Sequence, residues 1–316
     1  MPARLASSPA VRLAAYGALL VGLLLGGAAV GAAFGPAPAA APHTTRAGEA
    51  ATNPSSPVPA GLAVSQHGFQ LHLATPTIRA GRPAELQFVI AGPDQRPVTD
   101  FDVAHDKELH LVVVSRDLAT FAHVHPARDA AGTWRVAAPA LPAGSYRVYA
   151  DFVPAGGPAT TLAADLAVPG DYRPAPPPVP TRVASVDGYD VHLAGELVAG
   201  DESAVTVTVS RAGAPVTDLD PYLGALGHLV AIRDGDLAYL HVHPLDQLDG
   251  PGGPSIRFAV DVPTAGTYGF YVDFSHGGAV HSARFVAVAT SGPAAAGAPT
   301  TVVPGGAAGD HGTHGG

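Results

Sequence analysis

The sequence predicts an all-β protein, in which two tandem Ig-like or cupredoxin-like β-sandwich repeats follow an N-terminal apolar helix. Three observations lead to this prediction. Glycine (38 residues) and proline (32 residues) are too frequent for long helices and favour short strands joined by turns. Apolar or alternating runs bounded by Gly, Pro and Asp recur along the body of the chain. The body itself contains one unit twice.

The N-terminus is expected to direct the chain to the cell envelope. Arg4 and Arg12 precede residues 13–34, which carry no charged side chain. A run of this length exceeds the roughly 7–15 apolar residues of a cleaved signal and reaches the roughly 20 needed to span a bilayer. We therefore expect an uncleaved single-pass anchor within residues 1–35, while the small residues at 37–41 keep cleavage and secretion open. In either case the rest of the chain is exported, because the positive end stays inside.

Composition divides the remaining chain into two repeats and three low-complexity segments. The repeats are expected at residues 63–170 and 183–290. The other segments are rich in Pro, Ala and Gly, and we expect them to be linkers or disordered tails. They are residues 36–62, residues 171–182, and residues 291–316 with His311 and His314.

Duplication is visible as motifs that recur at a fixed offset. Pro-Val-Thr-Asp, His-Leu-Val and His-Val-His-Pro each occur once in each repeat, in the same order and with the same spacing. Gly-Ser-Tyr and Asp-Phe follow in the first repeat, and Gly-Thr-Tyr and Asp-Phe follow in the second, which has a slightly longer loop before them. The matched segments are 97–100 with 215–218, 110–112 with 228–230, 123–126 with 241–244, 144–146 with 266–268, and 151–152 with 273–274.

Each repeat is expected to contain roughly six to seven strands, a number typical of a sandwich. Pro-Ala-Gly-Ser-Tyr146 and Thr-Ala-Gly-Thr-Tyr268 resemble the tyrosine corner of Ig-like and fibronectin-like sandwiches, which supports this architecture. The strands that periodicity predicts are residues 86–90, 109–114, 146–152 and 161–168 in the first repeat, and 204–209, 228–232, 256–260, 268–274 and 283–288 in the second.

The repeated histidines are the candidate metal ligands. His123 and His125 are two apart on an extended segment, so they project from one face, and the following proline holds the second of them extended. His110 lies far enough upstream for a strand, a turn and an antiparallel return, so we expect it to face this pair. Three imidazoles on a strand pair suit Zn(II), Cu(II) or Ni(II). The second repeat offers the same set in His228, His241 and His243.

Other polar residues are candidates for completing these sites. Asp151 and Asp273 occur at matching positions, and each either ligates the ion, orients an imidazole, or bonds a neighbouring loop. His276 follows Asp273 closely and, with His281, flanks a Gly-Gly turn that can bring a further donor to the second site. We therefore expect two metal sites of different affinity, one in each repeat. The alternative is that His-x-His-Pro stabilises a turn and was copied by duplication.

Composition excludes several classes of function. The chain has no cysteine and its one methionine is Met1, which excludes disulfides, thiolate zinc sites, cysteine-ligated copper and methionine-rich copper(I) sites. The net charge of −9 and the absence of a basic cluster argue against nucleic acid as a partner. We expect no enzyme, because the sequence contains no nucleophile–base arrangement.

Residues 221–230 (PYLGALGHLV) and 237–244 (LAYLHVHP) resemble a domain of bacterial cell-envelope proteins, especially those of high-GC Gram-positive bacteria. The resemblance covers both repeats, although residues 103–109 of the first depart from the pattern. It implies association with copper or heavy-metal handling and with another envelope metal-handling protein as a partner.

Three functions compete at this point. The first is an exported protein, tethered only through its N-terminal helix or secreted, that buffers or transfers Cu(II) or Zn(II) without catalysis. The second is an extracellular Ig-like module for adhesion or partner binding, in which the histidines are structural. The third is a cupin-type metal enzyme, which also uses a His-x-His pair but requires a glutamate shortly after it. Pro126 is followed by Ala-Arg-Asp and Pro244 by Leu-Asp-Gln, so that glutamate is missing.

Overall fold

The computed structural model describes residues 16, 19–23, 59–246 and 252–292. Residues 16 and 19–23 are helical. Among the described residues, no helix is both long and apolar enough to cross a membrane. Most of the expected anchor or signal, residues 36–58 of the expected linker, and the tail with His311 and His314 lie outside the described residues.

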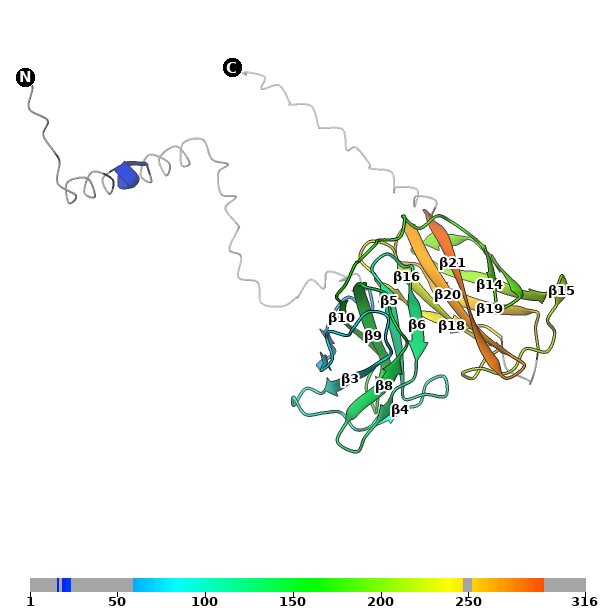
Figure 1. The fold of residues 1–316 in the computed structure, drawn as a ribbon, viewed down its shortest axis with the longest axis horizontal. Coiled ribbons are helices and arrows are strands. Elements are labelled where there is room, and N and C mark those ends of the chain that lie inside the picture. The colour runs from blue at the N-terminus through cyan, green and yellow to red at the C-terminus, as the bar shows by residue number, and fades with distance from the viewer. Residues whose placement is uncertain (1–15, 17–18, 24–58, 247–251, 293–316) are drawn as a thin grey trace, which may run out of the picture. The chain divides into compact units, whose positions relative to one another are not determined.

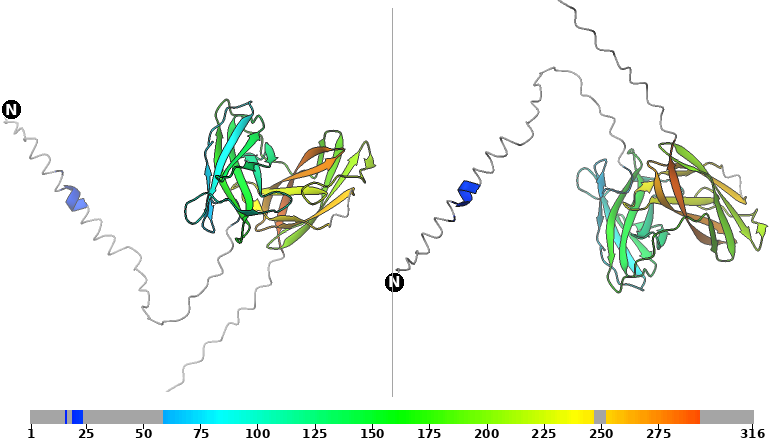
Figure 2. Two further views of the ribbon diagram at one scale, coloured as in Figure 1. Left: turned by 90° about the horizontal axis from the view of Figure 1, so that it is seen from below. Right: turned by 90° about the horizontal axis from the view of Figure 1, so that it is seen from above.

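The first repeat is a sandwich of two sheets (Figures 1 and 2). One sheet has the order β1-β2-β3-β8-β7, and the other has the order β10-β9-β5-β6, with β4 paired to β9. The strands are β1 Ser65–Gln66, β2 Phe69–Leu73, β3 Ala84–Ala91, β4 Phe101–Asp102, β5 Leu109–Ser115, β6 Phe121–Val124, β7 Ala127–Arg128, β8 Thr133–Ala138, β9 Gly144–Pro154 and β10 Thr160–Val168.

The second repeat has the same plan. One sheet has the order β11-β12-β14-β19-β18, with β15 paired to β14, and the other has the order β13-β21-β20-β16-β17. The strands are β11 Val183–Val186, β12 Tyr189–Ala194, β13 Leu197–Ala199, β14 Glu202–Arg211, β15 Ala214–Pro215, β16 Gly227–Arg233, β17 Tyr239–Leu240, β18 Val242–Pro244, β19 Ser255–Asp261, β20 Gly266–His276 and β21 Ala279–Ser291. The prediction of an all-β chain with two tandem sandwiches is confirmed, and every predicted strand lies within or overlaps one of these elements.

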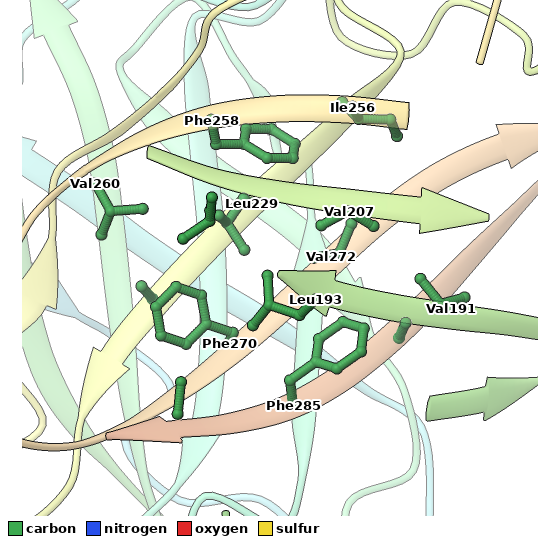
Figure 3. Packing of buried hydrophobic residues seen from close by; sticks show 14 of the residues in the cluster. Val191, Leu193, Val207, Leu229, Ile256, Phe258, Val260, Phe270, Val272 and Phe285 are labelled. Atoms are coloured by element: carbon green, nitrogen blue, oxygen red, sulfur yellow. The ribbon is translucent and has the colours of Figure 1, made fainter. Parts of the chain in front are cut away.

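Each sandwich encloses its own apolar core. In the second repeat, Figure 3 shows Phe258 and Val207 from one sheet facing Phe270 and Phe285 from the other. In the first repeat, Trp134 lies between the sheets, stacked on Phe88 with ring centroids 6.2 Å apart. Inward and outward side chains alternate along β12 and β14, as expected for strands with one solvated face.

The tyrosine corner is present in both repeats. The Tyr146 hydroxyl donates to the carbonyl of Pro142 at 2.8 Å, and the Tyr268 hydroxyl donates to the carbonyl of Thr264 at 2.7 Å. Each tyrosine thereby fixes the turn that leads into β9 or β20, the long strands that carry Asp151 and Asp273.

A third apolar cluster joins the two repeats, which belong to one compact unit. It forms because β5 is buried on both faces: alternate residues point into the first core, and the others point towards the second repeat. The buried members of this cluster are Val112, Val114, Leu118, Tyr149 and Ala163 from the first repeat, and Val230, Ile232, Leu237, Tyr239 and Tyr271 from the second.

Parts of the predicted linkers also pack onto the fold. Ala60 lies against the inter-repeat cluster and bridges Tyr239, and the Gly61 amide donates to the carbonyl of Thr161 at 3.1 Å. In the segment between the repeats, the Ala175 amide donates to Asp117 at 2.9 Å. Both ends of the first repeat are therefore tied down by hydrogen bonds that composition alone does not reveal.

Candidate metal centre

The strand pairing of the first repeat places two imidazoles on one face. His123 on β6 is registered with Val112 on β5, and His110 lies two residues before Val112 on the same strand. Because side chains alternate along a strand, both imidazoles project from the face that also carries Val112 and Val114. This is the face turned towards the second repeat.

The third imidazole comes from the second repeat. His228 precedes Val230 by two residues on β16, so it projects from the corresponding face of that repeat. One ring nitrogen each of His110, His123 and His228 lies within 4.8 Å of the others, which is the one group of potential metal ligands found among the described residues. The centre is thus shared, whereas the sequence predicted a separate one in each repeat.

Hydrogen bonds fix which ring nitrogens carry protons. His110 Nε2 donates to the carbonyl of Ala104 at 3.0 Å, and a carbonyl only accepts. His123 Nδ1 donates to the Asp273 carboxylate at 2.8 Å. In the neutral rings, the remaining nitrogens, His110 Nδ1 and His123 Nε2, are therefore lone-pair acceptors. These two acceptors face each other at 3.1 Å, so a cation, either a proton or a metal ion, is needed between them.

Asp273 is positioned to orient His123 rather than to bind an ion directly. It lies on β20 opposite His228, and its side chain is 4% exposed while that of His123 is 1% exposed. The Ser282 hydroxyl donates to its other carboxylate oxygen. A carboxylate behind an imidazole fixes the tautomer and raises the basicity of the ligating nitrogen, as is common around metal sites.

Two more imidazoles lie beside His110, His123 and His228, the three residues that we call the trio. The ring of His125 lies 4.7 Å from that of His123 and 5.0 Å from that of His110, measured between centroids. The ring of His105 lies 5.7 Å from that of His228. His125 Nε2 and His228 Nδ1 are buried without a hydrogen-bond partner in the described part of the chain, so both retain donor or ligand capacity that the protein does not use.

Burial favours the neutral form of three of these rings, those of His110, His125 and His228. Loss of solvation lowers the pKa of His110 to about 4, although the Ala104 carbonyl opposes the shift and the neighbouring imidazoles add to it. Loss of solvation, reinforced by His123 and His110, also lowers the pKa of His125 to about 3. The same causes bring the pKa of His228 well below its usual value. Neutral imidazoles are the form that binds metal ions.

The second repeat does not assemble its own trio. In the first repeat β6 continues through His123, whereas β17 ends at Leu240 and the chain then crosses to pair with β19 in the other sheet. His241 falls at this crossover and is exposed, and His243 lies 3.4 Å from Glu202. His228 therefore joins the histidines of the first repeat.

Two other predicted residues lie apart from the trio. His276 projects from the opposite face of β20 to Asp273, where it bonds the Tyr189 hydroxyl at 2.7 Å and Asp218 at 3.1 Å. Asp151 is registered with His110 but accepts a hydrogen bond from Thr161 at 2.8 Å. It lines a cavity of about 200 Å³ beside the trio, together with His105, His110, His228 and His241.

A family model described as "Domain of unknown function (DUF8832)" matches the chain twice, at residues 63–173 and 184–291. The chain belongs to this family. The two DUF8832 domains correspond to the two sandwiches, and the residues of the trio fall in both of them. No curated protein matches the sequence.

Several solved structures are similar to parts of the chain, with low sequence identity and low TM-scores. Salmonella alpha-2-macroglobulin reacted with methylamine is 14% identical with a TM-score of 0.26, over 72% of this chain and 15% of that one. The Escherichia coli adhesin FdeC is 14% identical with a TM-score of 0.26, over 72% of this chain and 66% of that one. The Yersinia pseudotuberculosis adhesin InvE is 12% identical with a TM-score of 0.20, over 69% of this chain and 58% of that one. The DUF8832 chain thus spans less than two thirds of each, and nothing about its function follows from them.

Proposed function

We propose that the two DUF8832 domains together hold one Cu(II) or Zn(II) ion between them, and that the protein buffers or transfers this metal without catalysis. The observation that carries the proposal is the contact between His110 Nδ1 and His123 Nε2. When both rings are neutral, these nitrogens present lone pairs to each other at 3.1 Å, while the opposite ring nitrogens donate to Ala104 and Asp273. A divalent ion ligated by both, and by His228, supplies the missing positive charge.

The donor set supports this choice of metal. Imidazole nitrogen suits Zn(II) and Cu(II), and Zn–N bonds of about 2.0–2.1 Å separate neighbouring ligand nitrogens by little more than the 3.1 Å found here. His110 and His123 therefore need only small movements to ligate one ion. The two imidazoles donate their other N–H groups to a carbonyl and to a carboxylate, which are the partners that orient ligating histidines in metal sites.

The cellular setting of this proposal comes from the sequence alone. The basic and then apolar N-terminus indicates export, with the sandwiches outside the membrane as either a tethered or a secreted protein. A metal ion is the expected ligand, and an envelope metal-handling protein is the expected partner for transfer.

Calorimetric titration of the full chain with Zn(II) and Cu(II) at pH 7.5 tests the proposal. We expect one ion per chain with high affinity, and a large loss of affinity in His123→Ala. His72→Ala is the matched control, because His72 is an exposed strand histidine remote from the trio in sequence and outside its ligand group. Absence of uptake, or equal uptake by His123→Ala and His72→Ala, refutes metal binding at the trio and leaves the competing proposal of an Ig-like partner-binding module.

A further inference from the structure

The two repeats contact each other through reciprocal interactions. The Tyr149 hydroxyl donates to the carbonyl of Leu237 at 2.6 Å, and the Tyr271 hydroxyl donates to the carbonyl of Leu118 at 2.7 Å. Both tyrosines occupy matching positions in the repeats, and both leucines adopt a left-handed backbone, with φ of 58° at Leu118 and 63° at Leu237. Exchange of the same contact in both directions is the mark of an approximate two-fold axis.

Two members of the trio are related by this axis. His110 and His228 are equivalent residues of the two repeats, and their rings are stacked with centroids 5.2 Å apart and planes 11° apart. An ion bound by both rings would therefore have one equivalent ligand from each repeat. The first repeat contributes His123 as the next ligand, and the equivalent residue of the second repeat is His241.

The carboxylates behind these positions repeat as well. Thr161 donates to one oxygen of Asp151 from the neighbouring strand, and Ser282 donates to one oxygen of Asp273 in the same manner. The second oxygen of Asp273 accepts the N–H of His123. The second oxygen of Asp151 has no hydrogen bond from a side chain in the described residues, and its equivalent partner would be His241.

Open space separates Asp151 from that partner. Both residues line the cavity of about 200 Å³, whose wall also includes His110 and His228. His241 is exposed at the crossover between β17 and β18.

We infer that His241 is the fourth ligand of the ion. Its imidazole turns into the cavity, donates one ring N–H to Asp151, and presents the other nitrogen to the ion held by His110, His123 and His228. The inference rests on the proposed metal site and makes it a centre of four imidazoles. Two of them are related by the axis, and the other two are supported by aspartates. Four nitrogen donors suit tetrahedral Zn(II) and tetragonal Cu(II).

His125 is the rival for this position. Its ring is already beside His110 and His123, and its Nε2 is buried without a partner. The symmetry favours His241, because the free oxygen of Asp151 corresponds to the Asp273 oxygen that accepts the N–H of His123. The equivalent of His125, His243, lies beside Glu202 and not in the cavity wall.

Competitive Zn(II) titration of the full chain, with electron paramagnetic resonance of the Cu(II)-loaded protein, tests the inference. We expect four nitrogen donors in the natural chain and three in His241→Ala, with Zn(II) affinity at least about tenfold lower in the variant. Asp151→Asn should weaken Zn(II) binding by about 10–100-fold in the natural chain, and by little when His241 is already alanine, because the carboxylate acts through that ring. His125→Ala is the control and should leave the nitrogen count unchanged.

The outcomes separate the two proposals. If the natural chain takes up no metal, the proposed function fails and the fourth ligand fails with it. If metal binds and His123→Ala weakens binding, but His241→Ala has unchanged affinity and nitrogen count, the metal site stands and the inference is overturned. Loss of a nitrogen donor in His125→Ala instead of His241→Ala overturns it equally.

Discussion

Replacing Asp273 with asparagine tests whether the carboxylate orients His123 for an ion. The side chains are almost completely buried, and the contact from His123 Nδ1 to Asp273 Oδ2 is 2.8 Å. A buried, charge-assisted hydrogen bond contributes about 1.5–3 kcal/mol. Loss of such a partner behind a metal ligand weakens metal binding by about 10–100-fold, which corresponds to about 1.4–2.7 kcal/mol. Asparagine keeps the shape of the side chain and removes its charge. The energy of the lost hydrogen bond and the energy of the weakened metal binding therefore agree in size.

The assay is competition for Zn(II) against a chromophoric chelator, on the full chain at pH 7.5. We expect the dissociation constant of Asp273→Asn to rise by about 10–100-fold. Asp187→Asn is the matched control, because Asp187 accepts a hydrogen bond from His281 Nδ1, also at 2.8 Å, outside the trio. Equal dissociation constants for Asp273→Asn and Asp187→Asn would refute the argument that Asp273 supports a metal ligand.

Three further predictions concern stability. Tyr149→Phe and Tyr271→Phe each remove a buried hydrogen bond between the repeats, and each should lower the free energy of unfolding in urea by about 1–3 kcal/mol; no change in either contradicts the reciprocal interface. The pKa of His110 is about 4 in the folded protein and 6.5 when unfolded, so the unfolded chain binds more protons in this window. The metal-free protein should therefore lose about 3 kcal/mol of unfolding free energy as pH falls from about 6.5 to about 4, and His110→Gln should lack this component; equal pH profiles contradict it. Phe258→Ala leaves a cavity between the sheets of the second repeat and should cost about 3–5 kcal/mol in urea unfolding; a cost below about 1 kcal/mol contradicts the placement of that ring in the core.

The fold was accessible from the sequence because its determinants are local. Alternating and apolar runs predict strands such as β9 and β20, and the two Gly-Ser/Thr-Tyr corners mark where these strands begin. The convergence of His110, His123 and His125 also follows from local pairing, since one strand, a turn and a return bring them together.

The candidate metal centre is shared because the two repeats pack against each other, and the pattern of apolar residues in the sequence does not specify this packing. His228 lies beside His110 and His123 because one face of each sandwich packs against the other sandwich. The sequence does contain one indication of this packing: residues 109–114 are apolar except for a single histidine, a pattern typical of a strand buried on both faces. The position of His241 depends on where β17 ends, and duplication alone predicted that it would repeat the place of His123.

Crystals of the full chain grown with Zn(II), with anomalous diffraction recorded at the zinc edge, test the central claim most directly. One anomalous peak is expected between His110, His123 and His228, at about 2.0–2.1 Å from His110 Nδ1 and His123 Nε2. A peak within one repeat alone, or zinc only on the exposed histidines with the trio empty, would contradict a metal centre shared between the two domains.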